Sequence, residues 1–151
     1  MELLIPQITL ETLTESERER YIALDQRPYG KQLAHSVATK LTRNPTESGG
    51  LYFSHRDYCG MGLYIYDGKF TLGAVNDGRG PFPIVAIFEF EADFVQWLAN
   101  ASDQSMALYG DNFNNQTLTK LRLEWYLEAD YSSIWNAFCE YNGRRIEKEA
   151  K

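Results

Sequence analysis

The middle of the chain alternates between apolar and polar residues in a pattern that predicts an antiparallel meander of three strands. Asp67-Gly68 separates two β-rich runs, Gly62–Tyr66 and Lys69–Val75. This dipeptide favours a two-residue turn in which both central residues have positive φ. In the next run, Phe82–Phe90, every even position is apolar, whereas the odd positions change from apolar residues to Glu89. We therefore expect a central strand that is buried along one whole face and along only the first half of the other.

Apolar residues recur at helical spacing on both sides of this meander. Thr14 and Glu17 have the spacing of a capping box and mark the start of the first helix. Pro28 and Asn44-Pro45 mark breaks on either side of the second helix. The expected helices are Glu15 to about Leu24, Tyr29–Thr42, Glu91–Ala101, a single turn at Met106–Tyr109, Thr117–Glu128, and a last helix that begins at Asp130 or Ser132.

Two further segments have features of strands. Leu3–Leu10 is apolar but broken by Pro6, so it is either an edge strand or a lead-in segment. Leu51–Tyr58 has period-2 character and would place a fourth strand in the row, with a turn or bulge expected at Gly60 and Gly62. No repeat or linker divides the chain, so residues 1–151 are predicted to form one domain. The predicted fold class is α+β, an antiparallel three- to four-stranded meander sheet packed with N- and C-terminal helices.

Composition adds that the protein is globular and acidic. Hydrophobic residues make up 44% of the 151 residues and aromatic residues 14%, which suits a core that needs no disulfides. The net charge of −6 argues against direct nucleic-acid binding, which needs a basic surface, but is compatible with a basic protein partner. The N-terminal segment has no basic region, Pro6 and Glu11 interrupt its apolar residues, and the chain has only two cysteines. These features predict a cytoplasmic protein with no signal peptide, no membrane span and no membrane partner.

His55, Asp57 and Cys59 bring imidazole, carboxylate and thiol together in sequence. On a strand they would share one face, as in a nucleophilic cysteine site or part of a metal site. A nucleophilic cysteine normally takes its histidine from a distant segment, and zinc would need further ligands, for which His35 and Cys139 are the remaining soft candidates. We therefore expect no catalytic residue, no metal and no cofactor. A small enzyme that uses His55 and Cys59 is kept as a less favoured alternative.

Two other patterns have ordinary explanations. The glycine-rich turn Asp77–Pro81 lacks the Gly-Lys-Ser/Thr of a phosphate-binding loop and leads into a strand, so we interpret it as a hairpin loop. The carboxylate pairs Glu89/Glu91 and Glu124/Glu128 are of the kind that a glycosidase uses, but a chain with 21 acidic residues contains such pairs by chance. We interpret both pairs as solvated faces.

The tyrosines and their acidic neighbours are better candidates for binding. The chain has ten tyrosines, and the meander places Tyr64 and Tyr66 on the face opposite Leu63 and Ile65. Tyrosine is enriched in binding hot spots, although packing in the core remains an open alternative for each one. Acidic residues beside tyrosines would suit a basic partner. The candidate partner-binding residues are Tyr64, Tyr66, Asp67, Asp77, Asp111, Glu124, Glu128, Asp130 and Tyr131.

Three segments, mostly within Tyr64–Leu127, resemble bacterial immunity proteins of contact-dependent growth inhibition and other polymorphic toxin systems. The first is the hairpin YDGKF, and the second is the helical run DFVQWLANASDQS, in which Ala101 stands where the pattern has Gln. The third is the helical run NQTLTKLRLEWYL. The matching residues are Tyr66, Asp67, Gly68, Lys69, Phe70, Asp93, Phe94, Val95, Trp97, Leu98, Ser102, Asp103, Ser105, Asn115, Gln116, Thr119, Arg122, Leu123 and Leu127.

This resemblance implies a cytoplasmic inhibitor rather than an enzyme. Such a protein binds one cognate toxin C-terminal domain, often a nuclease, and occludes its active site. The acidic, aromatic-rich composition fits that role, because nuclease domains are commonly basic and acidic side chains can stand in for nucleic-acid phosphates. The alternative is a non-catalytic adaptor or binding protein with a different partner.

Overall fold

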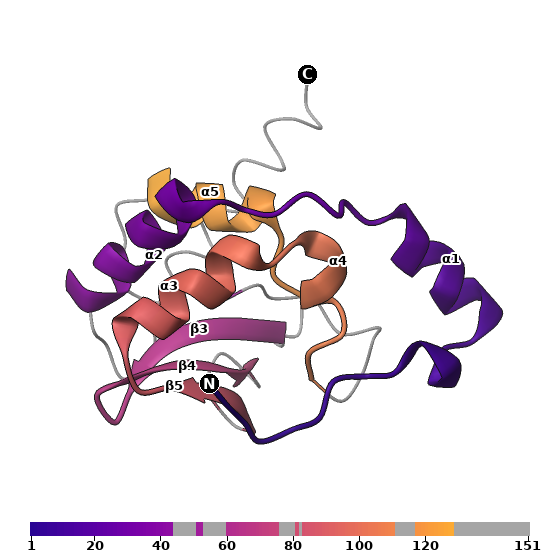
Figure 1. Ribbon diagram of the computed structural model, residues 1–151, viewed down its shortest axis with the longest axis horizontal. Coiled ribbons are helices and arrows are strands. Elements are labelled where there is room, and N and C mark those ends of the chain that lie inside the picture. Colours follow the sequence, from indigo (N-terminus) through magenta and orange to yellow (C-terminus); the bar gives the residue numbers. More distant parts are fainter. Residues whose placement is uncertain (44–50, 53–59, 76–80, 82, 111–116, 129–151) are drawn as a thin grey trace.

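The computed structural model describes residues 1–43, 51–52, 60–75, 81, 83–110 and 117–128. They contain an antiparallel sheet of five strands in the order β1-β5-β4-β3-β2 (Figure 1). The three long strands form the predicted meander, and a two-residue edge strand pairs on each side of it. The predicted antiparallel α+β fold is confirmed, and the sheet has a fifth strand because Glu2–Leu3, which overlaps the expected segment Leu3–Leu10 only at Leu3, pairs with β5. The strands are β1 (Glu2–Leu3), β2 (Leu51–Tyr52), β3 (Gly60–Tyr66), β4 (Lys69–Val75) and β5 (Ile84–Phe88).

Most helices lie near the ranges expected from the sequence, but α5 begins at Lys120 rather than at the expected Thr117. Thr14 and Glu17 form the predicted capping box, in which the Glu17 N–H donates to Thr14 Oγ1 at 3.2 Å and the Thr14 N–H donates to Glu17 Oε1 at 2.8 Å. The turn expected at Met106–Tyr109 lies slightly earlier in the chain, and the expected last helix lies outside the described residues. The helices are a 3₁₀ turn (Leu10–Thr12), α1 (Glu15–Ala23), α2 (Lys31–Arg43), α3 (Glu91–Asn100), α4 (Asp103–Met106) and α5 (Lys120–Glu128).

The helices α2, α3 and α5 form a layer against the sheet, and α1 stands apart from it (Figure 1). The main core lies between the layer and the sheet, and its fully buried side chains come from strands and helices alike. A small second cluster around Leu13 and Ala107 holds the N-terminal segment against α4. There the Gln104 N–H donates to the Asp25 carbonyl at 3.0 Å, and Gln104 Nε2 donates to the Tyr21 carbonyl at 3.3 Å.

The hairpin between β3 and β4 has the predicted turn. Asp67 and Gly68 both have positive φ, 52° and 73°, as a type I′ turn requires. The pairing of β3 with β4 then runs from Tyr66 opposite Lys69 to Gly60 opposite Val75 without a register shift. The expectation of a turn or bulge at Gly62 is therefore wrong, since Gly62 lies in regular strand; Gly60 has a φ of 157° and is the first residue of β3.

The irregularity in the sheet lies instead between β4 and β5, at Leu72/Gly73. A Cβ at Gly73 would clash with Pro81 and would lie 3.2 Å from the Pro83 carbonyl oxygen. The Ala74 N–H donates to the same carbonyl at 2.9 Å. Only glycine therefore lets the two chains approach this closely.

The strand predicted over Phe82–Phe90 is observed over Ile84–Phe88; Phe82 lies outside the described residues, and the prediction is wrong at Phe90. Ala86 and Phe88 are fully buried, as expected of a central strand. Phe90, however, lies beyond the end of β5 as the N-cap residue of α3, and its side chain is 65% exposed. Its carbonyl accepts from the Asp93 and Phe94 N–H groups at 3.2 Å, so the backbone has already turned from the sheet into the helix.

Candidate partner-binding surface

The structure places the predicted partner-binding residues at very different depths. Tyr66 is 40% exposed, and Asp67 is exposed beside it in the β3–β4 turn. Tyr64 is only 1% exposed and pairs with Thr71, which is buried to the same extent. The interpretation of Tyr64 as a surface aromatic is therefore wrong, because the sheet is buried on both faces at that position. Glu124 and Glu128 lie on α5. The remaining predicted partner-binding residues lie outside the described part of the chain, and they are Asp77, Asp111, Asp130 and Tyr131.

Strand register brings the hairpin tip next to the start of α3. Phe70 pairs with Phe88 across β4 and β5. Because the two strands are antiparallel, the residues just before Phe70 lie beside those just after Phe88. The turn that carries Asp67 therefore adjoins the Glu89–Glu91 junction, at the lower left of Figure 1.

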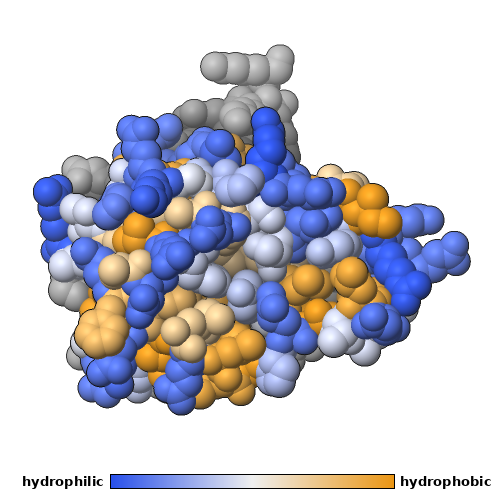
Figure 2. All heavy atoms as spheres, in the orientation of Figure 1, coloured by the Kyte–Doolittle hydropathy of each residue, from blue (hydrophilic) through white to orange (hydrophobic). Residues whose placement is uncertain are grey.

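This end of the molecule combines exposed carboxylates with exposed aromatic rings. Figure 2 shows apolar and charged side chains interspersed there. Four carboxylates there are exposed, and they belong to Asp67, Glu89, Glu91 and Asp93. The neighbouring cation, Lys69, is half-buried. Phe90 and Tyr66 supply the apolar contact area. We call this the tip surface, and it consists of Tyr66, Asp67, Glu89, Phe90, Glu91 and Asp93.

An aromatic cluster lies beneath the tip surface and holds its two parts together. The rings of Phe88 and Phe94 meet edge to face with centroids 5.5 Å apart, and Phe88 also contacts Trp97 at 4.8 Å. Trp97 Nε1 donates a hydrogen bond of 2.9 Å to the Tyr109 hydroxyl. Buried aromatic pairs of this kind add to the energy of area burial, so the tip surface rests on a firmly packed base.

Four members of the tip surface were not among the candidates from the sequence. Glu89 and Glu91 were interpreted as an ordinary solvated face, and Phe90 as part of the strand core. The helical pattern that begins at Glu91 is the signal that could have identified Phe90, because a strand cannot extend into a helix start. Asp93 was named from the sequence as a residue that matches the family pattern, but not as a candidate for partner binding.

The acidic residues of α5 form a second, separate surface. Glu124 is half-buried and Glu128 is exposed. Their helix is fixed to α2, where Lys40 Nζ donates to the Tyr126 carbonyl and lies 4.5 Å from the centre of the Tyr126 ring. Figure 1 shows α5 at the top of the molecule and the β3–β4 turn at the lower left. One globular partner face would therefore meet either the tip surface or α5 rather than both.

The residues of the alternative enzyme site, His55, Asp57 and Cys59, lie outside the described residues, as does Cys139. His35 is exposed on α2. Among the residues that the structure describes, no group of three or more His, Cys, Asp and Glu side chains is placed to hold a metal ion.

Comparison of this chain with known protein families, with curated proteins and with solved structures finds no match. In the described part of the chain, no helix has both the length and the apolar composition that crossing a bilayer requires.

Proposed function

We propose that this protein is a cytoplasmic immunity protein that binds a cognate toxin C-terminal domain and neutralises it by covering its active site. The toxin domain has a basic surface, and a nuclease is the activity that such a surface serves best. The protein acts by binding alone, with no cofactor and no chemical step. Neither nucleic acid nor a membrane takes part directly.

The observation that carries this proposal is the tip surface. It places four exposed carboxylates around two exposed aromatic side chains in a chain whose net charge is −6. Rim charges steer a basic partner and raise the association rate, whereas aromatic anchors supply most of the affinity. A nuclease site that holds phosphates would offer the matching cations, so the carboxylates would occupy the places of those phosphates.

Motif residues of the resemblance support the scaffold beneath this surface. Phe94 and Leu98 are fully buried in α3, and Leu123 is fully buried in α5. Ser102 and Ser105 form a reciprocal capping box at the start of α4. Of these residues, Phe94 packs directly beneath the tip surface, against Phe70 and Phe88, which suits an inhibitor that must present a pre-formed face to its target.

Affinity capture followed by a protection assay tests the proposal. The tagged protein is expressed in its own host, and co-purifying proteins are identified by mass spectrometry. We expect a stoichiometric small basic domain of a larger secreted protein, and we expect co-expression with this protein to rescue cells from that domain. Recovery of no basic polypeptide, or of one whose toxicity the protein does not reduce, would contradict the proposal.

Matched charge reversals connect the outcome to the tip surface. The double variant Glu89→Lys/Glu91→Lys should capture much less of the partner, because the rim charges that steer it are reversed. Glu15→Lys/Glu19→Lys makes the same change in net charge on exposed positions of α1 and should retain it. If both variants bind alike, only net charge matters and the tip surface is not the interface.

A further double variant separates inhibition from the enzyme alternative. His55→Ala/Cys59→Ala removes the imidazole and the thiol on which that alternative rests. Full protection by this variant is expected for an inhibitor. Loss of protection with an unchanged far-ultraviolet circular dichroism spectrum would favour an enzyme.

A further inference from the structure

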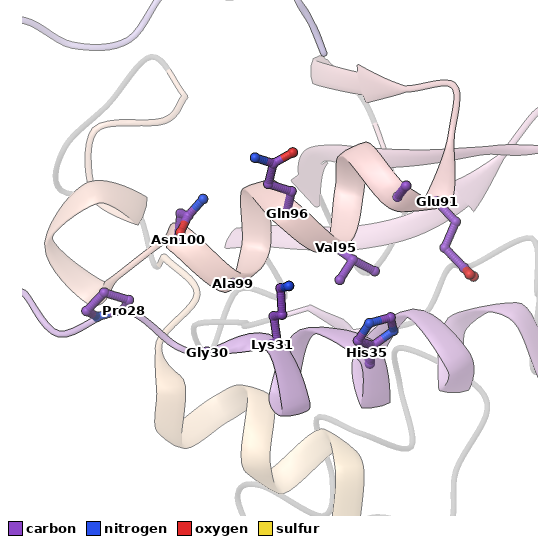
Figure 3. A pocket seen from close by; sticks show the side chains of 10 residues that line it. Pro28, Gly30, Lys31, His35, Glu91, Val95, Gln96, Ala99 and Asn100 are labelled. Atoms are coloured by element: carbon purple, nitrogen blue, oxygen red, sulfur yellow. The ribbon is translucent and has the colours of Figure 1, made fainter.

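A groove of about 520 Å³ runs along the side of α3 that faces away from α2. Gln96 and Asn100 line it, and both side chains point away from α2 (Figure 3). Met1 lines the groove from the sheet, because the pairing of Glu2 with Ile87 holds the N-terminal end of the chain beside β5 (Figure 1). The volume of the groove lies within the range of sites that bind small ligands.

The groove has an aromatic wall that is firmly held. Trp97 is half-buried, so part of its indole ring remains accessible from the groove. Its Nε1 donates to the Tyr109 hydroxyl at 2.9 Å, and these two rings meet edge to face with centroids 5.6 Å apart. The fully buried ring of Phe88 packs against the indole with centroids 4.8 Å apart. The indole is therefore fixed before any ligand binds, which lowers the entropy cost of binding.

Three exposed polar side chains follow the same face of α3 as the indole ring. Asp93, Gln96 and Asn100 lie four residues before, one before and three after Trp97, and all of them line the groove. In the described part of the chain, none of the three polar side chains takes part in a hydrogen bond or an ion pair. A ligand can therefore bond to all three without breaking a contact inside the protein.

The charges around the groove favour a cation. Among the described residues that line it, Asp93 has the only charged side chain. Asp93 also belongs to the tip surface, and the exposed Glu89 and Glu91 precede it at the start of the same helix. The amino group of Met1 forms no ion pair with Asp93, and its single positive charge is outweighed by these three carboxylates. The electron-rich face of the Trp97 ring adds to the attraction of a cation.

We infer that this groove binds the guanidinium group of an arginine of the toxin domain, an inference that rests on the proposed function. The guanidinium stacks on the Trp97 indole and donates to the Asp93 carboxylate. Its planar fork of five N–H donors needs several acceptors, and Gln96 supplies the next one along the helix. A lysine ammonium has neither the fork nor the stacking plane, so arginine is preferred. Asn100, one turn further along α3, bonds the backbone of the residue that carries the guanidinium.

Nuclear magnetic resonance titration of the full chain tests this inference with three acetylated and amidated tripeptides. They are Gly-Arg-Gly, Gly-Lys-Gly and Gly-citrulline-Gly, and citrulline has the shape of arginine without its charge. The arginine peptide should bind with a millimolar Kd and shift the indole N–H signal of Trp97, which Trp97→Phe identifies. It should bind about tenfold more tightly than the citrulline peptide, with the lysine peptide between them. Citrulline or lysine binding as tight as arginine binding, or shifts confined to residues outside the groove, would overturn the inference.

Matched variants locate the site. Asp93→Asn should weaken the arginine peptide about threefold to fivefold and leave the citrulline peptide unchanged, because only the charge attraction is lost. Asp67→Asn makes the same change at an exposed carboxylate outside the groove and should leave both peptides unchanged. Gln96→Lys adds a cation to the groove and should weaken the arginine peptide about tenfold, whereas Gln32→Lys, at an exposed position of α2, should not. Equal binding within either matched pair would overturn the inference.

The titrations contain no toxin, so they can fail while the proposed function holds. With a captured toxin domain that the protein neutralises, Gln96→Lys should weaken toxin binding and Gln32→Lys should not. A neutralised toxin that binds both variants equally would overturn this inference alone. Capture of no basic partner would instead contradict the proposed function.

Discussion

The rings of Phe70 and Phe94 stack with their centroids 4.5 Å apart and their planes at 18°. Phe70 follows the β3–β4 turn, and Phe94 lies in the first turn of α3. This contact therefore joins the two segments that form the tip surface. Both side chains are buried, so the hairpin and the helix start are expected to move as one unit.

Removing one ring of this pair should be costly. Phe94→Ala is expected to lower the free energy of unfolding by about 3–5 kcal/mol, because it leaves a cavity among Phe70, Phe88 and Trp97. Phe90→Ala removes the same atoms from an exposed position four residues away and should change it by no more than about 0.5 kcal/mol. Urea denaturation followed by tryptophan fluorescence measures both. Similar losses in the two variants would mean that Phe94 is not the anchor of the tip surface.

The stability of the protein should fall in alkali, through Tyr29. Its hydroxyl donates to Asp103 Oδ1 at 2.8 Å, and burial, together with the charge of Asp103, raises the pKa of Tyr29 above its ordinary value of 10.0. The unfolded chain then loses this proton at a lower pH than the folded protein does. The stabilisation is fully present below pH 10 and is lost above it, by about 1.4 kcal/mol per pH unit for each such tyrosine.

Tyr29→Phe checks the assignment by denaturation at a series of pH values. The variant should lose about 1.5 kcal/mol at neutral pH, because a hydrogen bond to a carboxylate is removed, and its stability should fall less steeply above pH 10. Part of the slope should remain, since burial also raises the pKa of Tyr126. An unchanged slope would show that Tyr29 ionises equally easily in the folded protein.

The β3–β4 turn and the start of α1 could be predicted from sequence because their causes are local. Asp67-Gly68 supplies two residues that tolerate positive φ, and Thr14 and Glu17 cap a helix through bonds within four residues. The long strands and the helices followed from periodicity, since each buries one face. Residues close together in sequence were therefore sufficient to predict the backbone wherever their own hydrogen bonds and preferred φ values determined it.

The burial of individual side chains could not be predicted in this way. Tyr64 and Tyr66 share a face of β3, yet one is buried and the other exposed, because burial depends on where the cover of the sheet ends. The approach of Asp67 to Glu89 depends on the register of β4 with β5, which brings together residues distant in sequence. The tip surface is therefore a property of the fold rather than of any one segment.

Gly73 should resist substitution for a steric reason and Gly68 for a conformational one. Gly73→Ala is expected to cost about 1–3 kcal/mol, because its Cβ would press on Pro81. At Gly68, which has φ of 73° and open space around it, alanine should cost about 1 kcal/mol through backbone strain. Asparagine tolerates positive φ, so Gly68→Asn should restore most of that loss, whereas Gly73→Asn should be worse than Gly73→Ala. Thermal denaturation of the four variants measures these differences, and rescue by asparagine at Gly73 would refute the steric explanation.

The two acidic surfaces should contribute unequally to toxin binding. On the tip surface, Phe90→Ala should weaken affinity by about 2 kcal/mol, roughly thirtyfold, as expected for an aromatic anchor among charges. Glu89→Lys/Glu91→Lys should slow association and flatten its dependence on salt concentration, because steering by rim charges is lost. On α5, Glu124→Lys/Glu128→Lys makes the same change in charge and should have the smaller effect, since Glu124 is half-buried whereas both tip glutamates are exposed. Surface plasmon resonance at several salt concentrations, with the toxin domain immobilised, separates association from dissociation. If the α5 variant loses binding while the tip variants keep it, the toxin binds at α5 and the tip surface has another role.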